Sequence, residues 1–113
     1  MTVWMTYNSN CGTARNVLAL LREKGIEPEI REYLKQPLTR DEIAALVAQM
    51  GVPVRDVMRS KEPLYAELAL AAADDDALLE AMARHPILLN RPIVRTPKGV
   101  KLCRPSEAVA TLL

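Results

Sequence analysis

The hydrophobic pattern at the start of the chain changes from a short apolar run to a helical repeat. Residues 2–6 are apolar and β-prone, and polar residues 8–10 follow them. From Cys11 onward, apolar residues recur at the i, i+3, i+4 and i+7 spacing of one helix face: Ala14, Val17, Leu18 and Leu21. Gly25 is placed to end this helix, and residues 29–34 have the pattern of a strand. This order predicts a βαβ unit with two parallel strands.

The middle of the chain, about residues 38–85, has a helical pattern. Thr39 and Glu42 have the spacing of a capping box at a helix start, and Gly51 is placed to end that helix. Further helices are expected over residues 53–59 and 62–70, and from the N-cap candidate Asp74 to Pro86. We therefore expect a helical insert within a single domain that spans residues 1–113.

A β pattern returns at residues 87–96. The turn formed by residues 97–99 leads into residues 100–104, which predicts a β-hairpin. Pro105 lies where the first turn of a last helix would begin, and this helix is expected to reach Leu113. The complete order is βαβ, helices, then ββα. It is that of an α/β, thioredoxin-like fold with a helical insertion.

Composition excludes several classes of function. The 113 residues are 50% hydrophobic with a formal net charge of +1, so bulk charge favours neither nucleic acid nor a membrane as partner. No apolar run approaches the roughly 20 residues of a membrane span, and the N-terminus lacks the features of a secretory signal. One His and no clustered Cys, Asp or Glu argue against a metal site. We expect a cytoplasmic protein with no bound metal or cofactor.

The candidate nucleophile is Cys11, where the loop after the first strand meets the start of a helix. Unpaired backbone N–H groups and the positive end of the helix dipole favour a thiolate there and lower the thiol pKa. The same groups can bind an oxyanion. Gly12 lets an incoming group approach the backbone closely, and Thr13 adds a hydroxyl donor. Arg15, one turn further along the helix, would supply positive charge to the site. The alternative is a half-buried structural cysteine.

Two arginines, Arg91 and Arg104, each precede a proline. Their planar guanidinium groups match a tetrahedral oxyanion. In a thioredoxin-like sheet the proline that opens the third strand is usually cis and faces the helix-start cysteine. Pro92 occupies that place, which would set Arg91 beside Cys11. Arg59 could approach from the other side. The alternative for each arginine is a solvated surface position.

The second cysteine, Cys103, has a different expected role. Neither cysteine belongs to a CxxC pair, so the dithiol of a thioredoxin is missing. Alternation along a strand places Cys103 on the opposite face from Leu102 and Arg104. If Arg104 faces the site, Cys103 is a small buried hydrophobic residue; the alternative is a resolving thiol. Tyr7, near Cys11, could donate a hydrogen bond or simply pack.

At this point the sequence resembles the glutaredoxin-coupled arsenate reductases, a thioredoxin-fold family that works with glutathione. The resemblance covers essentially the whole chain. It rests on residues 11–16 (CGTARN), 85–94 (HPILLNRPIV) and 102–107 (LCRPSE), with a weaker block at 50–59 (MGVPVRDVMR). The chain departs from the family prototype at Tyr7, where the prototype has a His four residues before the catalytic cysteine.

The resemblance implies that the Cys11 thiolate attacks arsenate and forms a covalent thiol–arsenate adduct. Arg59, Arg91 and Arg104 match the family's anion-binding arginines. Glutathione, as co-substrate, attacks the adduct. The partner glutaredoxin then removes the glutathionyl group, and arsenite dissociates. External thiols would explain why no second cysteine is needed near Cys11.

Two other functions stay open at this stage. The first is a non-enzymatic redox or transcription regulator resembling the Spx group, which shares the fold. Many of its members use a CxxC switch, whereas here Ala14 stands at the second position, and the arginine set favours the enzyme. The second is a glutathione-dependent thiol reductase that acts on another oxyanion or on a disulfide.

Overall fold

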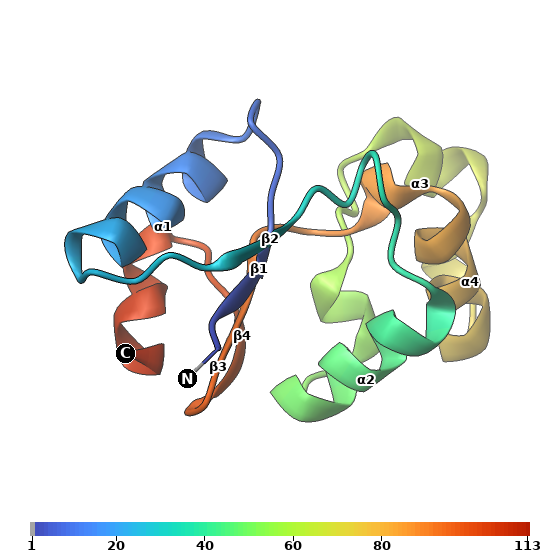
Figure 1. The fold of residues 1–113 in the computed structure, drawn as a ribbon. Helices are drawn as coiled ribbons and strands as arrows, with labels where there is room; N and C mark the ends of the chain where they lie inside the picture. Colours follow the sequence, from blue (N-terminus) through green and yellow to red (C-terminus); the bar gives the residue numbers. More distant parts are fainter. Residues whose placement is uncertain (1) are drawn as a thin grey trace. The chain divides into compact units, whose positions relative to one another are not determined.

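The structure, a computed structural model, describes residues 2–113, and these group into two compact units. One unit is formed by the two ends of the chain, up to Gln36 and from Arg91 onward; the other is Pro37–Asn90 (Figure 1). A single domain over residues 1–113 stays a prediction, and its first residue lies outside the described residues.

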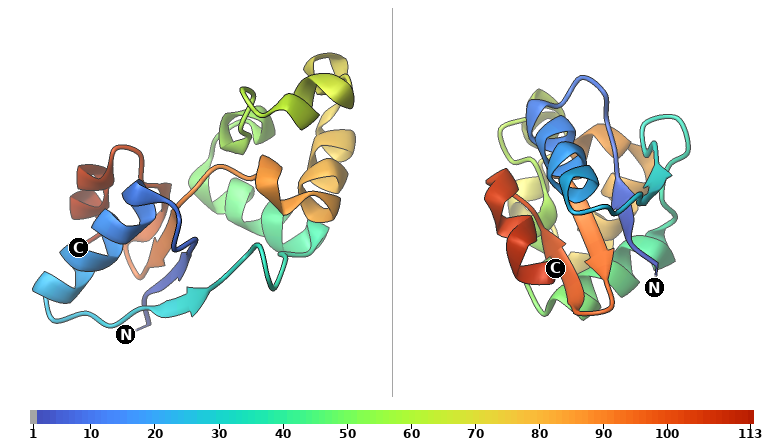
Figure 2. Two further views of the ribbon diagram at one scale, coloured as in Figure 1. Left: turned by 90° about the horizontal axis from the view of Figure 1, so that it is seen from above. Right: turned by 60° about the vertical axis from the view of Figure 1, so that its left-hand side comes forward.

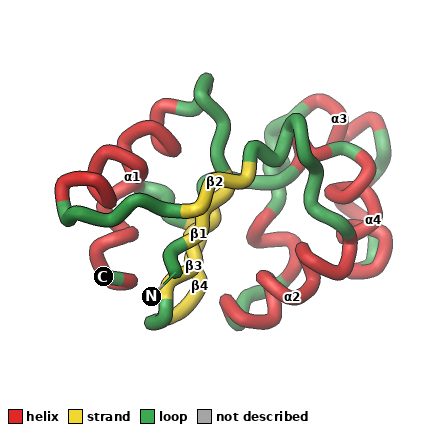
Figure 3. Tube along the Cα trace, viewed as in Figure 1, coloured by secondary structure: helices red, strands yellow, loops and turns green. Residues whose placement is uncertain are grey.

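The first unit contains a four-stranded sheet in the order β2-β1-β3-β4. The strands are β1 (Trp4–Thr6), β2 (Glu29–Arg31), β3 (Ile93–Thr96) and β4 (Gly99–Leu102). β1 and β2 are parallel, whereas β1 and β3, and β3 and β4, are antiparallel. All helices between β2 and β3 belong to the second unit. Figure 3 shows the helices in red and the strands in yellow. The thioredoxin-like α/β fold with a helical insertion is confirmed.

One face of the sheet is covered by helix α1 (Gly12–Glu23) and the 3-10 helix η4 (Ser106–Leu112), which pack against each other (Figure 2). The four residues predicted to form the apolar face of α1 are all buried. Gly25, with a φ of 76°, follows the helix in the left-handed conformation that favours glycine. The core of this unit comprises Val3, Met5, Val17, Leu18, Leu21, Val94, Cys103, Val109 and Leu112.

The second unit is helical. It contains α2 (Arg40–Met50), η1 (Val54–Val57), α3 (Pro63–Glu67), η2 (Leu70–Ala72), α4 (Asp75–Arg84) and η3 (Pro86–Leu88). The predicted capping box is present: the Thr39 hydroxyl accepts from the Glu42 N–H, and the Glu42 carboxylate accepts from the Thr39 N–H. The side chain of Asp74 caps α4, as predicted. Within residues 2–113, no helix has both the length and the apolar character that a membrane span requires.

Several elements differ from the prediction, among them two strand ends, the helices expected over residues 53–59 and 62–70, which are the shorter η1, α3 and η2, and the type of the last helix. The second strand stops at Arg31, because residues 32–36 form a turn closed by the Lys35 N–H on the Glu32 carbonyl. The third strand begins at Ile93 and not at residue 87, because η3 takes up the apolar run after Pro86. The last helix is of the 3-10 type. Short apolar runs fit a strand or a buried helical turn equally well, so their pattern alone cannot decide between them.

Arg55 ties η1 to the segment that follows α3. Its Nη1 donates to the Tyr65 hydroxyl at 2.5 Å and to the Leu70 carbonyl at 2.9 Å. Its Nη2 donates to the Ala73 carbonyl at 2.9 Å. One guanidinium therefore donates to two backbone carbonyls at the two ends of η2, in addition to the Tyr65 hydroxyl.

We expect Arg55→Lys to lower the free energy of unfolding by about 1–3 kcal/mol, because one ammonium cannot reach all three acceptors. Urea unfolding followed by circular dichroism measures this change. Arg40→Lys is the control: Arg40 pairs with Asp76 at the surface, so the loss there should stay below about 1 kcal/mol. Equal losses in the two variants would contradict the role given to Arg55.

Candidate active site

Cys11 is the N-cap residue of α1, with a φ of −96° and a ψ of 114°. Its N–H donates to the Asn8 carbonyl at 2.9 Å, and the Asn10 N–H donates to Asn8 Oδ1 at 3.0 Å. The Cys11 carbonyl accepts the Arg15 N–H, which begins the helix. These bonds fold residues 8–10 into a tight loop after β1 and place the thiol at the helix start, where Cys11 is only 4% exposed.

The residues that follow Cys11 have distinct positions. Gly12 is exposed and Thr13 half-buried in the first turn of α1. Arg15 turns back toward the loop, where its Nη1 donates to the Ser9 carbonyl at 2.6 Å. Arg15 therefore holds the loop in front of the cysteine, a contact that the sequence did not suggest.

Two arginines converge on the Cys11 sulfur within the first unit. The side chain of Arg91 hydrogen-bonds to the thiol. Nη1 of Arg104 lies 4.0 Å from the sulfur and also donates to the Arg91 carbonyl at 3.0 Å. The peptide bond between Arg91 and the buried Pro92 is cis, as expected from the fold. The structure thus brings together a thiol and two cations from segments about 80 and 93 positions apart in the sequence.

The pKa of the Cys11 thiol is lowered by this surrounding. Burial raises the pKa, because it disfavours the charged form. The Ala14 N–H, the hydrogen bond from Arg91 and the charges of Arg91 and Arg104 lower the pKa and outweigh burial. The Ala14 N–H lowers the pKa of the Cys11 thiol although the Cys11 side chain makes no regular capping hydrogen bond to the helix. A sulfur that ionises more readily is a better nucleophile at neutral pH.

Cys103 has the opposite character. It is fully buried in the core of the first unit, and burial raises the pKa of its thiol to about 11. Its N–H donates to the Pro92 carbonyl at 2.9 Å. The prediction of a small buried hydrophobic residue is confirmed.

Known proteins are similar to this chain in sequence and in fold. The model of the ArsC family matches residues 6–112. The chain belongs to the ArsC family. An arsenate reductase of Rhizobium meliloti (strain 1021) is 50% identical over 115 residues, which cover 100% of this chain and 82% of that protein. An arsenate reductase of Escherichia coli (strain K12) is 50% identical over 109 residues, 95% of this chain and 77% of that protein. The solved structure of an arsenate reductase from Vibrio cholerae has a TM-score of 0.96 and 41% identity, covering 100% and 98% of the two chains.

Two further candidate residues of this ArsC protein, Arg59 and Tyr7, make contacts other than with the Cys11 sulfur. Arg59 belongs to the second unit, in which its Nη1 lies 3.3 Å from a Glu62 carboxylate oxygen and 3.4 Å from the Ile87 carbonyl. Its part in binding an anion stays a prediction. Tyr7 packs against the core of the first unit, and its N–H donates to the Arg31 carbonyl.

Two residues beside the candidate site residues, Glu62 and Thr6, were not predicted from the sequence. Glu62 pairs with Arg59, and the i, i+3 spacing of opposite charges could have indicated this pair. Thr6 is fully buried at the end of β1, and its hydroxyl accepts the N–H of Ile93 at 2.9 Å. No sequence pattern marks that contact, because it joins residues 87 positions apart.

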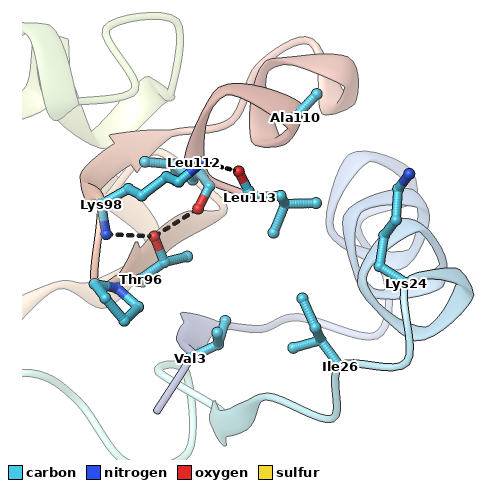
Figure 4. A pocket seen from close by; sticks show the side chains of 9 residues that line it. Val3, Lys24, Ile26, Thr96, Lys98, Ala110, Leu112 and Leu113 are labelled. Atoms are coloured by element: carbon cyan, nitrogen blue, oxygen red, sulfur yellow. Dashed lines mark hydrogen bonds between the residues drawn. The ribbon is translucent and has the colours of Figure 1, made fainter. Parts of the chain in front are cut away.

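A mostly apolar hollow lies at the other end of β1 and β3 from Cys11 (Figure 4). Its lining comprises Val3, Lys24, Ile26, Thr96, Pro97, Lys98, Ala110, Leu112 and Leu113. None of the candidate site residues contributes to it. Among residues 2–113, no three His, Cys, Asp or Glu side chains group in a way that could hold a metal ion.

We expect iodoacetamide to modify Cys11 selectively at pH 7 in the folded protein, because its thiol pKa is lowered while that of Cys103 is about 11. Mass spectrometry of tryptic peptides measures the rate at each cysteine. The pH midpoint for Cys11 in the folded protein should lie below that of the same thiol in the unfolded chain. Cys103 should react only after unfolding; similar rates for the two cysteines in the folded protein would show that this assignment is wrong.

Proposed function

We propose that this chain is an arsenate reductase with Cys11 as its nucleophile. The observation that carries the proposal is the convergence of Arg91 and Arg104 on a thiol whose pKa is lowered. This is the arrangement that a thiolate needs to attack an oxyanion, since it supplies both an activated sulfur and positive charge. Membership of the ArsC family and the arsenate reductases at 50% identity support arsenate as that anion.

In the first step the Cys11 sulfur attacks the arsenic atom of arsenate. A sulfur–arsenic bond forms, and an arsenate oxygen leaves as water after protonation. The guanidinium groups of Arg91 and Arg104 neutralise the anion and the charge that develops on its oxygens. Backbone N–H groups of Gly12 and Thr13, at the N-terminus of α1, offer further donors to the oxyanion.

The second step needs an external thiol. Reduction of As(V) to As(III) takes two electrons, which two thiols supply when they become one disulfide. Cys103 is a poor candidate for the second thiol, because it is buried and its pKa is about 11. We assign the first external thiol to glutathione, whose sulfur attacks the arsenic of the adduct, forms a second sulfur–arsenic bond and releases a further oxygen as water. A glutaredoxin thiol then attacks the glutathione sulfur and forms a mixed disulfide with it, while the electron pair of the broken sulfur–arsenic bond stays on arsenic. The resulting As(III), still bound to Cys11, is released by water as arsenite and leaves the Cys11 thiol free.

We propose that the reaction takes place in the cytoplasm. A reducing compartment supplies glutathione and keeps Cys11 and Cys103 as the free thiols that the structure contains. The third arginine of the anion-binding set is Arg59, which we include because it matches the family's motif. Binding of an anion by Arg59 would compete with its ion pair to Glu62.

The proposal predicts arsenate-dependent oxidation of NADPH when glutathione, glutaredoxin and glutathione reductase are supplied. Cys11→Ser should abolish this turnover, because a serine hydroxyl is not ionised at neutral pH. Cys103→Ser should largely retain it, because Cys103 lies in the core, away from the anion. Absence of turnover at millimolar arsenate, where another family member is active, would rule out arsenate reduction; binding to RNA polymerase without turnover would favour a regulator.

Replacing Arg91 or Arg104 by lysine should lower kcat/KM for arsenate by about 10- to 100-fold, because a point charge cannot reproduce a planar pair of donors. Arg59→Lys should act in the same direction. Arg22→Lys is the control, since Arg22 is exposed at the end of α1 and pairs with Glu27. Full activity in both the Arg91 and the Arg104 variants would remove these arginines from the mechanism.

A further inference from the structure

We propose that Thr6 is a positioning residue: its hydroxyl holds the segment Arg91–Pro92–Ile93 so that the Arg91 guanidinium meets the Cys11 sulfur. The effect of Thr6 on catalysis rests on the proposed function. Its geometry is independent of arsenate, because it concerns how the protein places an arginine beside a thiol.

The contact lies where the backbone pairing of β1 and β3 ends. The paired residues are Trp4 with Arg95 and Met5 with Val94. Continued by one position, the same register would set Thr6 opposite Ile93. There the Thr6 hydroxyl accepts the Ile93 N–H at 2.9 Å, and Thr6 is fully buried. A side chain thus adds one more bond between the two strands.

Ile93 directly follows the segment that carries Arg91 and Pro92. This segment is also held by residues that follow β4: the Cys103 N–H donates to the Pro92 carbonyl, and Arg104 Nη1 donates to the Arg91 carbonyl. Thr6 adds a contact from β1, the strand whose following loop carries Cys11. The bond from Thr6 therefore joins the segment that carries the arginine to the segment that carries the thiol.

Loss of this bond should change the ionisation of Cys11. Thr6→Val keeps the shape of the side chain but removes the hydroxyl that accepts the hydrogen bond. The buried Ile93 N–H then loses this acceptor. The segment can then move away from its present position, and Arg91 with it. Arg91 lowers the pKa of the Cys11 thiol through a hydrogen bond and its charge, so a displaced Arg91 should raise that pKa. Thr6→Ser keeps the acceptor.

The test measures the pH dependence of Cys11 alkylation by iodoacetamide in the full chain, for the wild type and three variants. For Thr6→Val we expect the midpoint to rise by about half to one pH unit, and alkylation below the midpoint to slow by about 3- to 10-fold. Thr6→Ser should restore the wild-type midpoint. In the coupled assay, Thr6→Val should lower kcat/KM for arsenate more than Thr6→Ser does.

Thr96→Val is the matched control. Thr96 is also a buried threonine of the sheet, and its hydroxyl donates to the Leu112 carbonyl at 2.7 Å and accepts the Lys98 N–H at 3.1 Å (Figure 4). It lies at the other end of β3 from Arg91. Thr96→Val should lower the thermal stability, as Thr6→Val does, but leave the Cys11 midpoint unchanged.

A wild-type midpoint in Thr6→Val would overturn the proposal, as would equal shifts in Thr6→Val and Thr96→Val, which would indicate general loosening. If Thr6→Val does not fold, the smaller Thr6→Ala is judged by the same criteria. If the wild type shows no arsenate turnover but Thr6→Val still raises the Cys11 midpoint, the positioning role is supported and the proposed function is rejected. The two failures are therefore distinguishable.

Discussion

A sulfur that is shielded from water becomes a thiolate only if nearby charge and hydrogen bonds offset the cost of burial. At Cys11 this offset comes from the Ala14 N–H together with Arg91 and Arg104. Both arginines depend on the sheet for their place: Arg91 lies just before β3, and Arg104 lies just after β4. The order of the strands therefore decides the reactivity of a residue in a loop far away in the sequence. At Cys103, in the same unit, burial outweighs the charge of Lys101 and raises the pKa of the thiol.

Several features could be predicted from the sequence because local rules decide them. Spacing and backbone conformation decide the buried face of α1, the capping box at Thr39 and the glycines that follow α1 and α2. The fold could be predicted as well, because a βαβ unit followed by helices and a hairpin permits few arrangements. The approach of Arg91 to Cys11 followed from that fold, since Pro92 opens the third strand.

What the sequence did not show depends on contacts between distant segments. Nothing in the pattern indicates that Arg15 turns back to the Ser9 carbonyl, or that the Thr6 hydroxyl accepts the Ile93 N–H. The start of β3 was placed too early because the apolar residues after Pro86 suit a helical turn as well as a strand. Such choices depend on tertiary contacts, which no single window of residues contains.

The burial of Cys103 has a consequence for how the protein would behave in a cell. The chain has two cysteines, and the thiol of Cys103 is enclosed in the core, so it is poorly available to form a disulfide with Cys11. In the proposed mechanism, turnover would follow the supply of glutathione, and a depleted glutathione pool would stop the reaction at the adduct. Under that mechanism, the same thiol pool that protects a cell against oxidants would limit the rate of arsenate reduction, so oxidation of the pool would slow the reaction as well.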